Sequence, residues 1–320
     1  MARRTMIVIA ILTAMTIPTI THAAPAEAAR KRILFGAYVP PAPHEGMGAV
    51  TDVERQIGAK LDTILFYQAW GGGHAAFDAS WVNAAGTSNR NVYLTWEPWR
   101  PGEGANQPDY SLASILSGRH DDYIRSWARG VKTVGKLVYL RPMHEMNGNW
   151  YPWGGGVNGN TAAQYVQTWR KIVGMFRAEG VKNARWIWSP YSVDVPSTNR
   201  FEAFYPGSSY VDVVAIDGYN WGACEPTYGG WQSFDQVFAG AYSRVMKMGT
   251  RRPIWIGETA APPEGGDKAK WIADMFKVLK TAKYQYVSAV TWFSTNKECD
   301  WRMTSPASAV NALAQSLAAR

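Results

Sequence analysis

Eight short β-rich runs alternate with longer stretches of helical periodicity along most of the chain, and this order limits the fold more than any other feature. The β-rich runs are residues 33–38, 63–68, 91–97, 136–145, 184–189, 211–218, 254–258 and 287–293. Apolar residues recur every three to four positions in the clearest helical stretches, which are 121–134, 161–179, 233–248 and 268–280. Eight strands separated by helices or long connections predict an α/β fold, in which a parallel sheet closes into a single-domain (β/α)8 TIM barrel.

An open, doubly wound sheet is the alternative architecture. Such a sheet calls for a glycine-rich phosphate-binding turn after its first strand, where this chain has Pro40-Pro41-Ala42-Pro43. The sequence contains neither an internal repeat nor a linker that would set off a second domain. We therefore predict one barrel domain over residues 33–320, preceded by a short extension at residues 24–32.

Residues 1–23 have the pattern of a signal peptide. Arg3 and Arg4 precede an apolar stretch at residues 6–20, and small residues for cleavage follow at residues 21–24. An uncleaved anchor is the alternative. No other apolar run approaches the length of a membrane span. We therefore expect a secreted, extracellular protein that has no membrane partner after cleavage, and we expect it to be a monomer.

The charge and the cysteines exclude several classes of protein. The formal net charge is +8, but the basic residues are scattered and the longest run of them is Arg30-Lys31-Arg32. A solvated basic surface explains this pattern, and no nucleic-acid partner is expected. Two cysteines are too few for a disulfide framework or a cysteine-rich metal site. We expect one disulfide, Cys224–Cys299, between the loops after the sixth and eighth strands, with two free thiols as the alternative.

Acidic residues stand at the ends of several predicted strands, where the active site of such a barrel forms. They are Glu97, Glu145, Asp217 and Glu258. A pair of carboxyl groups on separate strands suits glycoside hydrolysis, because one must donate a proton to the leaving oxygen while the other attacks the anomeric carbon. We select Glu145 as acid/base and Glu258 as nucleophile. Glu97 is the third candidate, and it is expected to bind substrate or to pair with Arg141.

Arg141 precedes Glu145 by four residues, so strand alternation predicts that both side chains point the same way. Two roles for Arg141 stay open: it holds a nucleophile ionised, or it makes a structural ion pair beneath the site. The segment beginning His144-Glu145 lacks the second histidine of a zinc-binding helix, and no Gly-x-Ser-x-Gly occurs. We expect neither a metal nor a cofactor.

The chain is rich in aromatic residues, with 16 Trp and 16 Tyr. Many of them lie beside Gly, Pro and Asn, as Trp99 and Trp150 do, and not inside periodic apolar segments. Flat rings in loops indicate a ligand cleft, because they bury apolar surface at small entropic cost. We therefore expect an aromatic-lined cleft that takes a neutral polysaccharide.

The segment Arg141-Pro142-Met143-His144-Glu145-Met146-Asn147-Gly148-Asn149-Trp150 and its continuation to Gly154 closely resembles the strand-four signature of glycoside hydrolase family 26. Further similar segments follow in order at residues 95–99, 217–222 and 256–258, so that the resemblance covers about residues 33–303. It implies a (β/α)8 barrel with the acid/base after strand four and the nucleophile after strand seven. These positions match Glu145 and Glu258.

The resemblance also implies roles for the surrounding residues. His144 would hold the sugar at the reacting subsite, Tyr219 would hydrogen-bond the nucleophile, and Trp292 would form an aromatic platform under the reacting sugar. Further substrate contacts are expected from Trp150, Trp99, Glu97 and Asp217. For Trp150 and Trp292, ordinary core packing is the alternative.

The substrate expected from the resemblance is β-1,3-1,4-glucan of mixed linkage. Residues 231–238, and Phe293 directly after Trp292, favour it. An endo-β-1,4-mannanase is the alternative within the family. A carbohydrate-binding protein that has lost catalysis is the alternative from another class.

Overall fold

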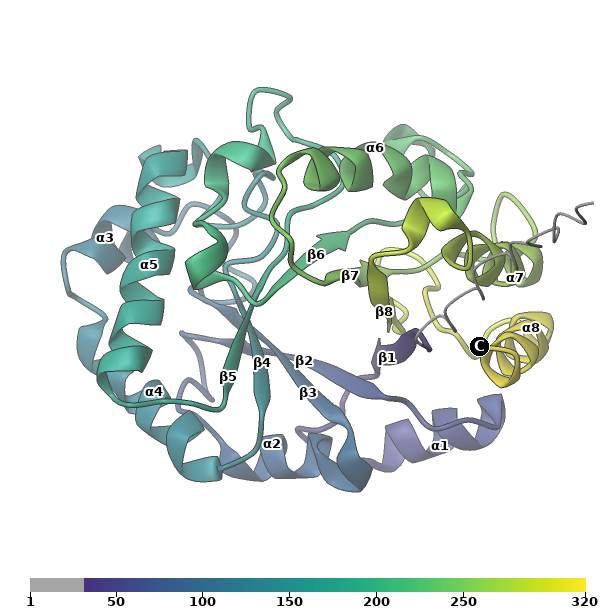
Figure 1. The fold of residues 1–320 in the computed structure, drawn as a ribbon, viewed down its shortest axis with the longest axis horizontal. Coiled ribbons are helices and arrows are strands. Elements are labelled where there is room, and N and C mark those ends of the chain that lie inside the picture. The colour runs from purple at the N-terminus through teal and green to yellow at the C-terminus, as the bar shows by residue number, and fades with distance from the viewer. Residues whose placement is uncertain (1–31) are drawn as a thin grey trace, which may run out of the picture. The chain divides into compact units, whose positions relative to one another are not determined.

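A computed structural model describes residues 32–320 and contains a closed parallel barrel, as the sequence predicted (Figure 1). Each strand pairs with the next one in the chain, and β8 pairs with β1 to close the sheet. The predicted signal peptide at residues 1–23, and all but residue 32 of the extension at 24–32, lie outside the described residues. The strands are β1 Leu34–Tyr38, β2 Thr63–Ala69, β3 Asn91–Glu97, β4 Val138–Pro142, β5 Ala184–Trp188, β6 Val213–Asp217, β7 Ile254–Thr259 and β8 Val287–Phe293.

Helices surround the strands on the outside of the barrel (Figure 1). Several begin at residues with the expected capping chemistry. The hydroxyl of Thr161 accepts from the backbone of Gln164, whose side chain accepts in turn from the backbone of Thr161, and Ser233 and Gln236 repeat this arrangement. The helices are α1 Gly48–Ile57, α2 Ala79–Ala85, α3 Leu112–Leu116, α4 Asp121–Val134, α5 Ala162–Ala178, α6 Phe234–Lys247, α7 Lys268–Leu279 and α8 Ala307–Ala318. Within residues 32–320, no helix is both long and apolar enough to cross a membrane.

Strand β4 ends earlier than the sequence predicted. It stops at Pro142, and the following Met143 and Glu145 have φ values of +51° and +52°. These angles lie in the left-handed region, which no β-strand contains. The expectation that Arg141 and Glu145 share one face of a strand is therefore wrong, because Glu145 belongs to the loop.

The barrel has two apolar layers, one inside the strands and one between the strands and the helices. Within each strand, the side chains alternate between these layers. The inner layer consists of Leu34, Tyr38, Leu65, Tyr67, Tyr93, Tyr139, Ile187, Val213, Ala215, Trp255 and Ala289. Continuing this alternation along each strand shows which residues emerge at the carboxyl end of the barrel.

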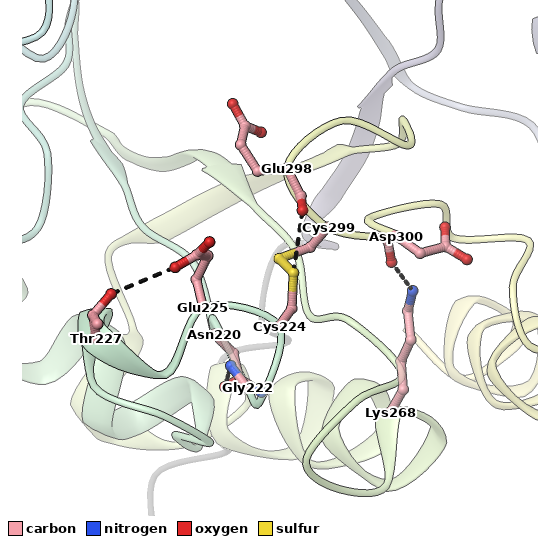
Figure 2. The surroundings of a disulfide bond; sticks show 9 residues. All are labelled: Asn220, Gly222, Cys224, Glu225, Thr227, Lys268, Glu298, Cys299 and Asp300. Atoms are coloured by element: carbon pink, nitrogen blue, oxygen red, sulfur yellow. Dashed lines mark hydrogen bonds between the residues drawn. A yellow bond between two sulfur atoms is a disulfide. The ribbon is translucent and has the colours of Figure 1, made fainter.

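The predicted disulfide is present between Cys224, after β6, and Cys299, after β8 (Figure 2). The two Cα atoms are 5.9 Å apart. Close to the bridge, the buried ammonium group of Lys268 donates hydrogen bonds to the backbone oxygens of Asp300 and Arg302, at 3.2 and 2.8 Å. The loop after β8 is thus fastened both to the loop after β6 and to the start of α7.

Candidate active site

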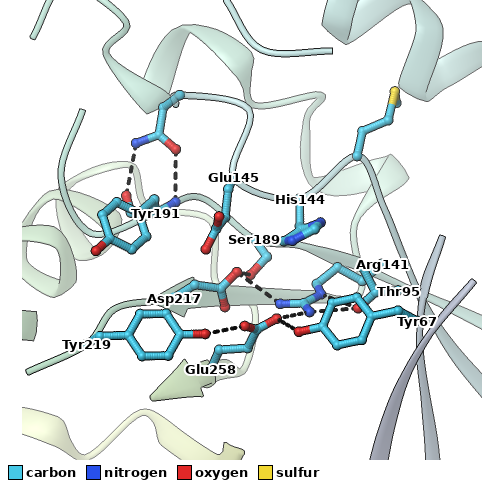
Figure 3. Close-up of polar contacts among 12 residues, drawn as sticks. Tyr67, Thr95, Arg141, His144, Glu145, Ser189, Tyr191, Asp217, Tyr219 and Glu258 are labelled. Atoms are coloured by element: carbon cyan, nitrogen blue, oxygen red, sulfur yellow. Dashed lines mark hydrogen bonds and ion pairs between the residues drawn. The ribbon is translucent and has the colours of Figure 1, made fainter. Parts of the chain in front are cut away.

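Glu258 receives hydrogen bonds from three side chains that come from three different strands or their ends. The hydroxyl groups of Tyr67 and Tyr219 donate to its two carboxylate oxygens, each at 2.5 Å. Figure 3 shows the two phenols pointing at Glu258 from opposite sides. Arg141 forms an ion pair with the same carboxylate. Burial and the negative charge of Glu258 raise the pKa of both phenols well above their usual value, so they remain hydrogen-bond donors.

An irregularity in β7 turns Glu258 toward this site. Trp255 belongs to the inner layer, so regular alternation would place Gly257 inside and Glu258 outside. The pairing of β7 with β8 shifts between Ile256 and Thr259, and this shift restores Glu258 to the inner face. Gly257 leaves room there, because a Cβ atom at this position would lie 2.4 Å from Oδ1 of Asp217.

Arg141 joins two acids beneath the mouth of the barrel. Its guanidinium forms ion pairs with Asp217, at 2.9 Å, and with Glu258, and it donates to the hydroxyl of Thr95 at 2.9 and 2.6 Å. Asp217 also accepts from the hydroxyl of Ser189 at 2.9 Å. Arg141 and Asp217 are completely buried. Arg141 therefore makes a buried structural ion pair, and one of its two partners is Glu258, the residue selected as nucleophile.

Glu145 lies across this cluster, in the loop after β4 (Figure 3). Its backbone N–H donates to the carbonyl of Ser189 at 2.7 Å, and Oε2 accepts from Nε1 of Trp150 at 2.8 Å. Burial raises the pKa of Glu145 well above its usual value, and the negative charges of Asp217 and Glu258 add to the effect. A carboxyl group in these surroundings keeps its proton near neutral pH and can donate it.

The predicted residues Glu97, Trp99 and His144 also lie at this end of the barrel. Nε1 of Trp99 donates to Glu97 at 3.2 Å, and burial raises the pKa of Glu97 to about 7. Glu97 makes no ion pair with Arg141. Burial and the charge of Arg141 lower the pKa of His144, so its imidazole is neutral. The His144 ring packs against Tyr151, and its Nδ1 has no hydrogen-bond partner among residues 32–320.

The expectation for Trp292 is wrong. Its indole is completely buried between the barrel and α7, where it packs edge-on against Trp271 and donates to the carbonyl of Trp301. The reason is strand alternation: Ala289 belongs to the inner layer, so Phe293 also faces inward and Trp292 faces outward. Phe293 stacks on Tyr38 at a ring distance of 5.0 Å. Phe293, and not Trp292, is the β8 aromatic beside the site.

The role expected for Asp217 also changes. Asp217 was expected to contact substrate, but its side chain has no exposed surface and is held by Arg141 and Ser189. Its position indicates that it supports the residues above it. Tyr67 was missed altogether, because β2 carries no motif. Strand alternation could have identified it: Leu65 faces the inner layer, so Tyr67, two residues further toward the carboxyl end of β2, faces the same way.

In residues 32–320, no group of three or more His, Cys, Asp or Glu side chains is placed to hold a metal ion. The site instead contains two carboxyl groups in different surroundings. Glu258 accepts hydrogen bonds from two phenols, and Glu145, opposite it, has a raised pKa. Fold and site together define a (β/α)8 barrel with a buried acidic centre at its carboxyl end.

Comparison with known proteins gives the family. The model of glycosyl hydrolase family 26 matches residues 45–255, and the chain belongs to this family. Over 291 residues the chain is 37% identical to Endoglucanase H of Acetivibrio thermocellus, an alignment that covers 89% of this chain and 30% of that protein. Over 110 residues it is 40% identical to Mannan endo-1,4-beta-mannosidase A and B of Caldalkalibacillus mannanilyticus, which covers 32% of this chain and 21% of that protein. The chain thus spans less than a third of the length of these curated relatives.

Solved structures show the same fold. A GH26 beta-mannanase from Bacteroides ovatus superposes with a TM-score of 0.65 at 20% sequence identity, over 89% of this chain and 88% of that one. A Bacillus subtilis mannanase gives a TM-score of 0.61 at 18% identity, over 89% of this chain and 85% of that one. At these identities, the likeness establishes the barrel.

Proposed function

We propose that the protein is a retaining endo-β-glycanase in which Glu258 is the nucleophile and Glu145 is the acid/base. One observation carries the proposal: the Glu258 carboxylate is held by Tyr67, Tyr219 and Arg141, opposite a buried carboxyl group with a raised pKa. A double displacement needs one ionised carboxylate that attacks and one protonated carboxyl that donates its proton, and different surroundings allow two acids to hold these two states.

In the first step, Glu258 attacks the anomeric carbon while the Glu145 carboxyl gives its proton to the departing glycosidic oxygen. The products are a glycosyl ester on Glu258 and a free chain end. In the second step, the Glu145 carboxylate takes a proton from water, whose oxygen attacks the same carbon and releases Glu258. The configuration at that carbon is inverted twice and is therefore retained.

As substrate we propose β-1,3-1,4-glucan, with β-1,4-mannan as the second candidate. Glucan is supported by the relative named Endoglucanase H, whose alignment covers most of this chain. Mannan is supported by relatives named mannan endo-1,4-beta-mannosidase, which align over shorter stretches, and by solved mannanases of the same fold. We further propose that the protein is exported, because residues 1–23 have a signal-peptide pattern and disulfides form in oxidising compartments.

The test is incubation with barley β-glucan, lichenan, galactomannan, glucomannan and β-1,3-xylan, followed by sizing of the products and NMR of the newly formed anomeric centre. We expect internal cleavage, with the β-anomer appearing first. Glu258→Ala and Glu145→Ala should each lose activity by orders of magnitude on the polysaccharide. Glu179→Ala, which removes an acid outside the site, should not. Binding without release of reducing sugar would instead identify a carbohydrate-binding protein, and an α-anomer formed first would exclude retention.

A further inference from the structure

A few large apolar side chains in residues 32–320 are exposed, and two of them lie at the carboxyl end of the barrel, where the acids gather. They are Leu137, Val193, Tyr228, Met246 and Tyr286. Leu137 and Tyr286 directly precede strands and so lie at the amino end of the barrel, and Met246 lies on α6. Val193 and Tyr228 follow β5 and β6, at the carboxyl end where the acids gather. Tyr228 is 63% exposed, which is the largest fraction of the five.

Tyr228 is the outer end of a continuous series of ring contacts and hydrogen bonds that begins at the proposed acid/base. Trp150, which donates to Glu145, packs edge-on against Tyr191 at a ring distance of 5.3 Å. The hydroxyl of Tyr191 accepts from Nε1 of Trp221 at 3.1 Å. The ring of Trp221 lies 4.8 Å from that of Tyr228. The series runs from the loop after β4 to the loop after β6.

This series lies on one particular side of the proposed nucleophile. Figure 3 shows Glu145 across from Glu258, beyond Asp217, with Tyr191 and Tyr219 toward one side of this group and Tyr67 and Arg141 toward the other. The acid/base protonates the leaving oxygen, so the leaving part of the chain must pass the side on which Glu145 lies. Rings that continue outward from Glu145 therefore face the leaving part.

The supporting loops hold these rings in place before any ligand binds. Trp301, which is buried, packs edge-on against Trp221 at a ring distance of 5.2 Å. Cys224, between Trp221 and Tyr228 in the sequence, is bonded to Cys299 in the loop that carries Trp301 (Figure 2). A surface fixed in this way loses little conformational entropy when it binds.

We propose that Tyr191, Trp221 and Tyr228 form a binding surface for the leaving part of a neutral polysaccharide, beyond the sugar that Glu145 protonates. The proposal depends on the function proposed above. Aromatic faces pack against the apolar faces of pyranose rings, and phenol hydroxyls can bond their hydroxyls. The only charged residue in the loop at residues 218–232 is Glu225, which would repel an anionic polymer.

The test compares substrates that do and do not place sugars on this surface. The first are a mixed-linkage β-1,3-1,4-glucopentaose and β-1,4-mannopentaose. The others are chloronitrophenyl glycosides of the corresponding trisaccharides, whose leaving group contains no sugar. The variants are Tyr228→Ala, Tyr228→Phe and Tyr286→Ala, the last of which makes the same truncation at the other end of the barrel.

For the pentasaccharide that the enzyme cleaves, Tyr228→Ala should lower kcat/KM by roughly fivefold to tenfold, as truncation of a well-placed interface aromatic does. Its cleavage site should move toward the reducing end, because fewer sugars are then held on the leaving side. Tyr228→Phe keeps the ring but loses the hydroxyl, so it should lose less kcat/KM than Tyr228→Ala, whereas Tyr286→Ala should behave as the unchanged protein does. All variants should cleave the aryl glycosides equally, because these substrates place no sugar on the surface. An unchanged cleavage pattern in Tyr228→Ala would overturn this inference. If the unchanged protein cleaves none of these substrates, the proposed function itself fails.

Discussion

Within residues 32–320, Arg141 is the only residue with a positive charge that forms an ion pair with Asp217 or Glu258, and replacing it by Met removes this charge. The change leaves both carboxyl groups buried without their counter-charge. Removing one partner of a buried ion pair costs about 3–5 kcal/mol of folding free energy. For a domain of this size, the dependence on urea is on the order of 3 kcal/mol per molar, so the unfolding midpoint should fall by roughly 1 M or more.

The loss should also depend on pH in a defined direction. Burial raises the pKa of Asp217, and the charge of Arg141 acts against it. Without Arg141 the pKa of the folded state rises further above that of the unfolded state, so the folded protein binds more protons. Stability then falls as pH rises, by at most about 1.4 kcal/mol per pH unit for each acid that takes up a proton. Because the pKa of Asp217 is already about 8 in the unchanged protein, the additional loss develops above pH 8. Urea unfolding at pH 6 and pH 9 should therefore show the larger loss at pH 9.

Thr95→Val is the matched control. It removes the hydroxyl that accepts from Nε and Nη2 of Arg141 and changes no charge. It should cost about 1–3 kcal/mol, the penalty of leaving buried donors unpaired, with little dependence on pH. If Arg141→Met lost equal stability at pH 6 and pH 9, or more at pH 6, the reasoning from buried carboxylates would be refuted.

Three further changes test other contacts. Trp150→Phe removes the hydrogen bond that stabilises ionised Glu145, so the pKa of this acid should rise and the alkaline limb of kcat/KM should move to higher pH. Gly257→Ala would bring a Cβ atom within 2.4 Å of a buried carboxylate oxygen, and should lower both thermal stability and activity. Replacing Cys224 and Cys299 by Ser opens a link across 75 residues and should cost about 4 kcal/mol or less in urea unfolding.

Each of these three changes has an outcome that would contradict it. If the alkaline limb of kcat/KM in Trp150→Phe stays in place or moves to lower pH, that limb is not set by the ionisation of Glu145. Full activity in Gly257→Ala would mean that the backbone of β7 yields to the added methyl group. Identical unfolding curves with and without the disulfide would mean that the bridge does not constrain the unfolded chain.

The barrel could be predicted from sequence because its signal is repeated eight times. An error of two or three residues at one strand leaves the order of strands and helices intact. The end of β4 shows where this reasoning stops. The strand predicted from the sequence extends to Glu145, and nothing in residues 136–145 reveals that Met143 and Glu145 adopt positive φ. Such angles are imposed by surrounding contacts, such as the hydrogen bond from the Glu145 backbone to Ser189.

The acids of the candidate site could be located because each stands at a strand end, but the direction of a side chain depends on strand parity. Trp292 and Phe293 are neighbours, and a register of one residue decides which faces the site. Counting from Ala289 would have chosen Phe293. The same count applied to β7 would have excluded Glu258, because the shift in pairing that turns it inward is not visible in the sequence. Counting every second residue along the strand is thus sufficient to find the inward-facing residue of β8, but it gives the wrong residue for β7.

The pairing of β1 with β8 has a consequence for how the chain reaches its folded state. The strand that closes the sheet is the last of the eight to be synthesised, so β1 and β7 each have an unpaired edge until β8 has been made and pairs with them. Contacts between such distant segments form slowly, and open strand edges pair readily with other chains. Slow synthesis or overproduction would therefore prolong the interval in which aggregation competes with closure, and the yield of soluble protein should depend on how quickly β8 becomes available.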